Sequence, residues 1–70
     1  MTDWHRRKTL PLSPEQRRLL AKIVGAGSYR PISREWTTAY SLERFGLATK
    51  LDFEMRPTER GKVEHQKHAP

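Results

Sequence analysis

The chain contains no cysteine, so neither a disulfide framework nor a thiolate metal site can stabilise its fold. No apolar run approaches the roughly 18 residues that a membrane-spanning helix needs. The N-terminus also lacks the apolar stretch of about 7 to 15 residues that is typical of a secretion signal. We therefore expect a cytoplasmic protein that has no membrane partner and whose stability comes from side-chain packing.

Constellations of catalytic or metal-binding residues are also missing. The histidines stand at His5, His65 and His68, near the two ends, and no carboxylate lies at a fixed helical spacing from them in a segment that we expect to be ordered. His65 and His68 are spaced i, i+3, but two imidazoles on a fraying end make only a weak metal site, and a solvated tail is the simpler interpretation. There is no glycine-rich phosphate loop. We expect no enzymatic activity, no cofactor and no metal.

The size and composition of the chain predict one small domain. A chain of 70 residues buries only about 60% of the surface that its unfolded form exposes. Hydrophobic residues make up 34% of it and charged residues 31%, which favours a compact centre between polar ends. We expect a basic N-terminal arm over residues 1–12, a domain over 13–63 and a polar tail over 64–70.

The charge of the chain indicates a polyanionic partner. The formal net charge is +6 and the sequence pI is about 10.3, and lysines and arginines that bind phosphates gain free energy by releasing condensed counterions. A solvated basic surface that keeps a small protein soluble would have the same composition. Charge alone does not separate the two interpretations.

A first helix is predicted over residues 14–24. Ser13 can accept a hydrogen bond from the amide of Gln16, whose side chain can reach back to close a capping box, and Pro14 suits the first turn. Gly25 is the expected residue after the helix end. The apolar side chains of this helix form one stripe: Leu19, Leu20, Ile23 and Val24. This stripe predicts a core helix.

A second helix is predicted over residues 33–45, with Ser33 as its N-cap and Gly46 as its stop. On a helical wheel, Trp36, Ala39 and Leu42 share the side that should face the first helix. The opposite side collects short hydroxyls and guanidinium groups: Arg34, Thr37, Ser41 and Arg44, flanked by Thr38. Such a surface suits a helix that enters the DNA major groove, although an ordinary solvated face has the same residues.

A short β-hairpin is predicted after Gly46. Leu47, Thr49 and Leu51 alternate in one segment, and Phe53, Met55 and Pro57 alternate in the next, as in strands that are half buried on a core. The turn should lie near residues 50–52. Lys50 at the tip and Arg56 on the return strand are the candidate phosphate contacts, or else charges that keep a strand edge from pairing.

A last helix is expected to start at Thr58, with Glu59 in its first turn. Its one apolar member is Val63, so this helix should be short and weakly held. The fold class predicted from all these elements is mainly α with a small β-hairpin, in one compact domain.

Two motifs carry a resemblance to a known family. The run Leu-Glu-Arg-Phe-Gly-Leu-Ala over residues 42–48 and the run Thr-Glu-Arg-Gly over 58–61 resemble the C-terminal half of bacterial winged helix-turn-helix regulators of the MarR-like and PadR-like type. The resemblance covers residues 13–63 in the order of elements. It implies sequence-specific binding of double-stranded DNA by a small transcriptional regulator, or by an accessory factor of a phage or mobile element.

The resemblance also implies which residues contact DNA. The recognition-helix role passes to Arg34, Thr37, Thr38, Ser41 and Arg44, and the wing role passes to Lys50 and its neighbours. A homodimer or a protein partner is compatible with such a module.

The N-terminus offers a further candidate contact. Arg6, Arg7 and Lys8 could form a basic arm that follows phosphates or enters a minor groove, although incidental charge in a disordered segment would look the same.

Two other kinds of partner are compatible with a chain of this composition. A protein-interaction module of the same fold would use its basic face for an acidic surface, and its sequence would look nearly identical. RNA is less favoured, since no pair of exposed aromatic residues is predicted on the strands.

Overall fold

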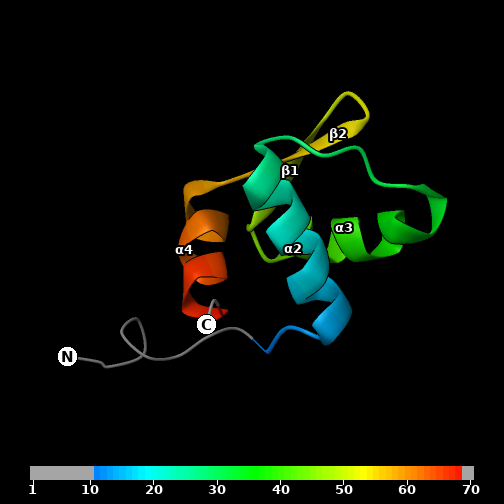
Figure 1. Cartoon of the computed structure of the whole chain (residues 1–70). Coiled ribbons are helices and arrows are strands. Elements are labelled where there is room, and N and C mark those ends of the chain that lie inside the picture. Colours follow the sequence, from blue (N-terminus) through cyan, green and yellow to red (C-terminus); the bar gives the residue numbers. More distant parts are fainter. Residues whose placement is uncertain (1–10, 69–70) are drawn as a thin grey trace.

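The computed structural model describes residues 11–68 and forms one domain, mainly helical with a small hairpin. The elements are α2 (Pro14–Ala26), a 3-10 turn η1 (Ser33–Glu35), α3 (Trp36–Arg44), β1 (Ala48–Leu51), β2 (Glu54–Pro57) and α4 (Glu59–His68). Helix α2 lies between α3 and α4 and packs against both, and the hairpin crosses one end of the helices (Figure 1). The predicted combination of helices and hairpin is confirmed at this level.

The start of α2 follows its sequence signal. The Gln16 amide donates to Ser13 Oγ at 3.1 Å, and the Ser13 amide donates to Gln16 Oε1 at 2.8 Å, so the predicted capping box is present. The predicted end at residue 24 is wrong. The helix continues to Ala26, because Gly27 and not Gly25 adopts the left-handed conformation (φ 79°) that terminates it.

The core lies where the three helices meet the hairpin. Leu20 and Ile23 from α2 meet Ala39 and Leu42 from α3, which confirms the predicted inward faces of both helices. Trp36 is only half buried and packs against the edge of this core. The buried hydrophobic residues are Leu12, Leu19, Leu20, Ile23, Ala39, Leu42, Leu47, Ala48 and Met55. Leu12 belongs to this core although it precedes the expected start of the domain.

The two ends of α3 differ in how well they were predicted. Ser33 does not cap the helix with its side chain, so the predicted N-cap is wrong. The chain enters through η1, where Glu35 Oε1 accepts from the amide of Ile32 at 3.0 Å. The predicted stop is confirmed: Gly46 has φ 78°, and its amide donates to the carbonyl oxygen of Glu43 at 2.9 Å.

The hairpin has its turn at residues 52–53, and Lys50 pairs with Met55 across the strands. Tyr29 adds an isolated bridge on the other side of Met55, so β2 lies between Tyr29 and β1. The predicted inward face of the first strand is wrong. Lys50 shares the core-facing side with buried Met55, whereas Leu51 points outward and is 49% exposed. On that side the ammonium group of Lys50 lies over aromatic rings of α3.

Helix α4 begins as predicted at Thr58, whose Oγ1 accepts from the amide of Gly61 at 3.0 Å. It extends to His68, past the expected domain end at residue 63, and Val63 is exposed. Packing of this helix depends on Gly61 and on Glu64, which are buried. Within residues 11–68 no helix is both long enough and apolar enough to cross a membrane.

Candidate nucleic-acid interface

The outer side of η1 and α3 presents part of the predicted recognition set to solvent. Arg34, Thr37 and Arg44 are exposed, and none of them forms an ion pair or a side-chain hydrogen bond within the described residues. Ala39 and Leu42 anchor the opposite side of the helix in the core. The outward guanidinium groups are therefore held by a helix with a well-packed inner face and are free to meet a ligand.

Two other members of the predicted set are engaged within the fold. Ser41 Oγ accepts from Gln16 Nε2 at 2.8 Å and donates to the carbonyl oxygen of Thr38 at 2.6 Å. Both Thr38 and Ser41 are half buried. Since the hydroxyl of Ser41 ties α3 to the first turn of α2, its geometry supports a positioning role for α3 and not a direct contact.

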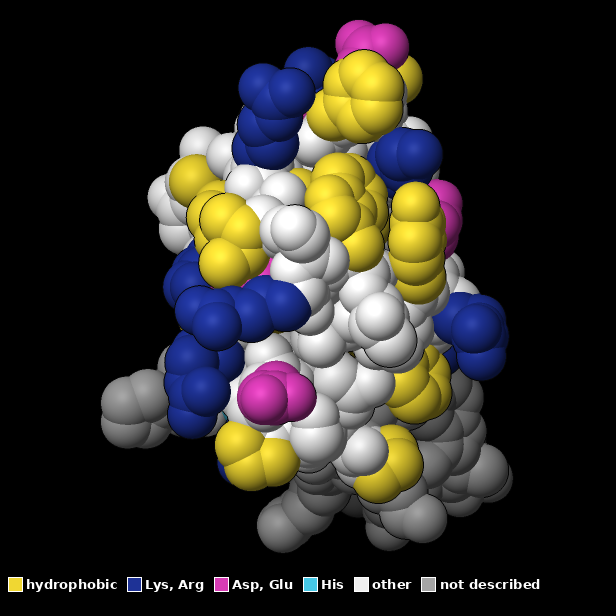
Figure 2. Space-filling model, turned by 90° about the vertical axis from the view of Figure 1, so that its right-hand side faces the viewer, with side chains coloured by type: hydrophobic (Ala, Val, Ile, Leu, Met, Phe, Trp, Pro, Cys, Tyr) yellow, Lys and Arg dark blue, Asp and Glu magenta, His cyan; other side chains and the backbone are white. Residues whose placement is uncertain are grey.

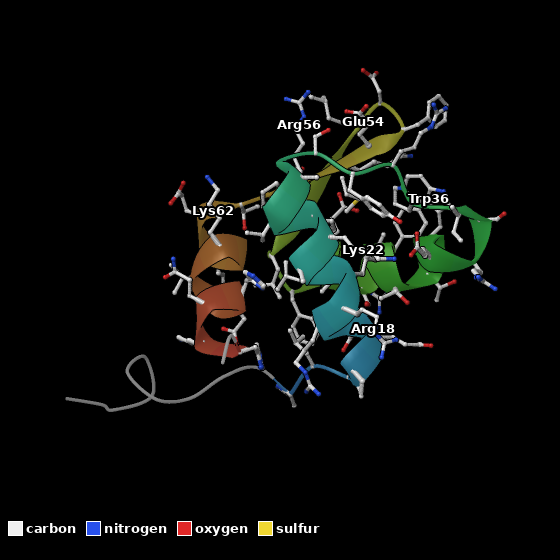
Figure 3. The ribbon with its side chains drawn as sticks, in the orientation of Figure 1. Arg18, Lys22, Trp36, Glu54, Arg56 and Lys62 are labelled. Atoms are coloured by element: carbon white, nitrogen blue, oxygen red, sulfur yellow. The ribbon has the colours of Figure 1, made fainter. Side chains whose placement is uncertain are left out.

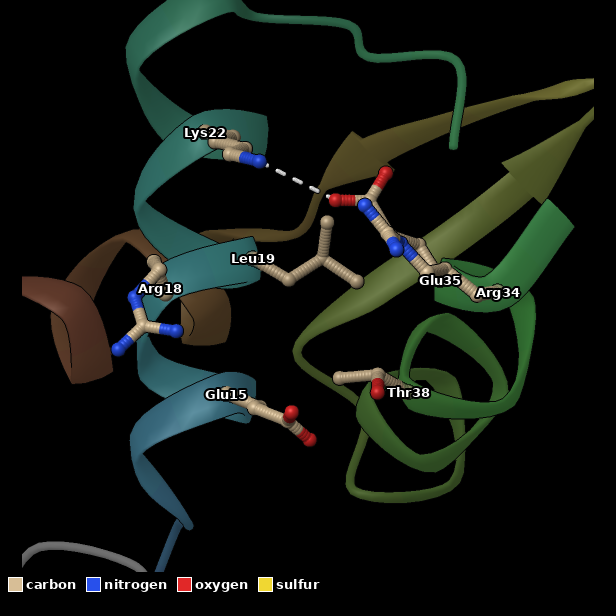
Figure 4. Close-up of a pocket in the computed structure, with 7 residues that line it drawn as sticks. All are labelled: Glu15, Arg18, Leu19, Lys22, Arg34, Glu35 and Thr38. Atoms are coloured by element: carbon tan, nitrogen blue, oxygen red, sulfur yellow. Dashed lines mark hydrogen bonds and ion pairs between the residues drawn. The ribbon is translucent and has the colours of Figure 1, made fainter. Parts of the chain in front are cut away.

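An open cleft of about 450 Å³ separates the exposed flanks of α2 and α3 (Figure 4). Arg18 and Arg34 stand at its edges, and Leu19 forms part of its floor. Lys22 Nζ bridges the cleft to Glu35 Oε2 at 3.1 Å. This arrangement places cations from two helices beside one another, with one of them neutralised by Glu35.

Glu35 is the polar centre that holds η1 in place. Its Oε1 also accepts from the Tyr29 hydroxyl at 2.7 Å. Burial raises the pKa of this carboxyl, but the hydrogen bonds from the Ile32 amide, the Tyr29 hydroxyl and the Lys22 ammonium outweigh burial and lower its pKa below the ordinary value. The same carboxylate raises the pKa of Lys22, first by hydrogen bonding and then by charge. Glu35 is therefore ionised at neutral pH and acts in structure, not as a proton donor.

Lys50 reaches from the hairpin onto α3 and lies among three aromatic rings. Its Nζ is 5.6 Å from the centroid of Trp36 and 6.0 Å from the centroids of both Tyr40 and Phe53. Trp36 and Tyr40 contact each other at 5.6 Å between ring centroids. We call Trp36, Tyr40 and Phe53 the aromatic patch. It joins the tip of the hairpin to the outer side of α3.

Two cations border the aromatic patch. The guanidinium of Arg30 lies 5.9 Å from the centroid of Phe53, and Lys50 lies between the rings. Phe53 is 63% exposed and Tyr40 is 45% exposed. Figure 2 shows hydrophobic side chains gathered in the upper half of this face, with Lys and Arg side chains on both sides of them.

The remaining predicted DNA contacts differ in whether the structure places them near this surface. Arg56 pairs with Thr49 on the side of the hairpin opposite to Lys50, and it points away from α3 (Figure 3). The structure therefore brings Lys50, and not Arg56, to the candidate interface. Arg6, Arg7 and Lys8 lie outside the described residues.

Sequence reasoning missed Arg30 and the aromatic patch as candidate site residues. Trp36 was assigned to the inward side of its helix, and Phe53 was assigned to a half-buried strand. The sequence did contain one usable signal, the position of Phe53 directly after Asp52. Asp52 adopts φ 59° in the turn of the hairpin, and the ring of Phe53 beside it projects into solvent.

No metal site adds to this interface, since the described part of the chain has no cluster of three or more His, Asp or Glu side chains that could hold an ion.

Comparison with known proteins finds no matching family model, no similar curated protein and no solved structure of similar fold at a significant level. Inferences about function therefore rest on the geometry described above.

Proposed function

We propose that this protein binds double-stranded DNA through the outer side of α3 and the adjoining hairpin, as a small winged helix-turn-helix module. The observation that carries the proposal is the position of Lys50, which packs on α3 beside the side that presents Arg34 and Arg44. Helix and hairpin thus meet at Lys50, and Arg34 and Arg44 are exposed on the adjoining helical segment. Guanidinium groups can read guanine edges or contact phosphates, and an ammonium group suits a phosphate.

The order of elements supports the same proposal. A core helix precedes α3, Gly46 ends α3, a two-stranded hairpin follows, and Thr58 caps α4. This is the order that the resemblance to MarR-like and PadR-like regulators implied. We assign direct contact to Arg34, Thr37, Arg44 and Lys50, and we assign Thr38 and Ser41 to positioning α3. The role in the cell would be that of a small transcriptional regulator or of a phage or mobile-element accessory factor.

The test is a fluorescence anisotropy titration of a labelled blunt duplex at a series of salt concentrations. Binding should weaken log-linearly with salt. Arg34→Ala and Arg44→Ala should each weaken binding by about 1 to 3 kcal/mol if they contact bases, and Lys50→Ala should reduce the magnitude of the salt slope by about 1.

Lys62→Ala is the matched control on α4. Lys62 lies on the far side of the molecule from Trp36 (Figure 3), so this variant should bind as the parent does. Absence of duplex binding at low salt would overturn the proposal and favour a protein with an acidic surface as partner. Equal losses in all four variants would show that net charge and not this surface determines binding.

A further inference from the structure

We propose that the aromatic patch binds unpaired DNA nucleotides, so that the protein prefers duplex DNA that carries a single-stranded extension over blunt duplex. The inference goes beyond duplex binding. It rests on the proposed function only in taking DNA as the partner.

The first argument is the exposure of rings from two separate elements on one surface. Trp36 and Tyr40 come from α3, and Phe53 comes from the turn of the hairpin, yet all three lie about one Lys50 ammonium. At 63%, Phe53 is the most exposed large hydrophobic residue in the described part of the chain. A ring in this position adds little to the core, because most of its surface is exposed. It can serve as a platform for a flat ligand.

The second argument is charge. Lys50 and Arg30 lie beside the rings, and neither forms an ion pair within the described residues. Their positive charge repels a cationic ligand and attracts a polyanion. Proteins that hold single strands combine these two elements, a basic surface that follows the phosphates and aromatic rings on which bases stack. Unpaired nucleotides match both, whereas bases inside a duplex keep their faces stacked on one another and cannot use the rings.

The third argument is the location of the patch relative to the proposed duplex site. Lys50 belongs to both surfaces, so a strand that leaves the duplex beside the hairpin would reach Phe53 without crossing the molecule. The patch and the outer side of α3 can then act on one DNA molecule at a junction of double-stranded and single-stranded segments.

The experiment compares three labelled DNAs at constant salt: a blunt duplex, the same duplex with a five-nucleotide thymine extension, and the same duplex with an abasic extension of equal length. The abasic extension keeps the added phosphates and removes the bases. We expect the thymine extension to tighten binding about fivefold or more over both other DNAs, as stacking on an aromatic ring does. All proteins carry Trp4→Phe, which leaves Trp36 as the one tryptophan, and its fluorescence should be quenched by the thymine extension alone.

Phe53→Ala should remove most of this gain and leave binding of the blunt duplex unchanged. Leu51→Ala is the matched control, an exposed apolar side chain on the other side of the hairpin, and it should keep the gain. Tyr40→Ala is a second variant of the aromatic patch, on α3, and should also reduce this gain.

Each outcome decides at least one of the two proposals, duplex binding or the role of the aromatic patch. Equal binding of the thymine and abasic extensions, or a gain that survives Phe53→Ala, overturns the role of the aromatic patch and leaves duplex binding standing. Binding of the duplex with the thymine extension, without binding of the blunt duplex, supports the patch and overturns the proposed duplex function. If no DNA binds, both are overturned.

Discussion

Gly61 on α4 packs directly against the backbone carbonyl of Leu47, so closely that a Cβ atom at position 61 would collide with the Leu47 oxygen. The contact joins the last helix to the segment between α3 and the hairpin. It is backbone on backbone, so no side chain can rotate away to make room.

Gly61→Ala should therefore destabilise the domain by about 1 to 3 kcal/mol, through overpacking that only a shift of α4 can relieve. Urea unfolding followed by circular dichroism measures the change. Gly25→Ala is the control, since nothing lies within 4 Å of the position where its Cβ would stand. That variant should stabilise α2 by up to about 1 kcal/mol. Equal stability of the two variants would contradict the close packing at Gly61.

Thr58 forms the second connection of α4 to the rest of the fold. Its Oγ1 accepts from the Gly61 amide at 3.0 Å and donates to the carbonyl oxygen of Gly46 at 2.7 Å. Thr58→Ala should cost about 0.5 to 2 kcal/mol, because it removes the cap and leaves the Gly46 carbonyl without this donor. Thr58→Ser keeps the hydroxyl and should retain most of the stability, as thermal unfolding can show. A serine variant as unstable as the alanine variant would assign the effect to the lost methyl group instead.

The elements with complete local signals were predictable from the sequence. Ser13 with Gln16, and Thr58 with Gly61, satisfy helix ends through residues three positions apart, so their geometry depends on little else. The prediction of Ser33 as the N-cap was wrong because Glu35 holds the start of this helical segment. The partners of Glu35 include Lys22 and Tyr29, which come from elsewhere in the chain. Local patterns cannot reveal a contact of that kind.

The candidate site was predictable only in part for the same reason. The outward direction of Arg34, Thr37 and Arg44 follows from helical periodicity, and the structure shows these residues exposed. The sides of the hairpin depend on strand register, and a shift of one residue exchanges them. Lys50 could therefore not be placed among the aromatic rings before the register was known.

Glu35 makes the stability of the domain dependent on pH. Because its pKa is lowered in the folded state, the ionised carboxylate stabilises the fold above the ordinary pKa of 4.5, and this contribution is lost as the pH falls through the folded-state pKa. Glu35→Gln removes the charge that the Ile32 amide, the Tyr29 hydroxyl and the Lys22 ammonium satisfy. We expect a loss of about 1 kcal/mol or more near neutral pH, since these are hydrogen bonds to a charged group.

The decisive measurement is the difference in urea unfolding free energy between the parent and Glu35→Gln, taken at about pH 7 and again at about pH 3. The difference should shrink at the lower pH, because the contribution of the ionised carboxylate is lost as the pH falls below the ordinary pKa. Glu43→Gln is the control, an exposed carboxylate on the same stretch of helix whose side chain has no hydrogen-bond or ion-pair partner within residues 11–68. It should change stability little at either pH. A difference for Glu35→Gln that stays constant across the range would show that the shape of the side chain, and not its charge, holds η1 against α2.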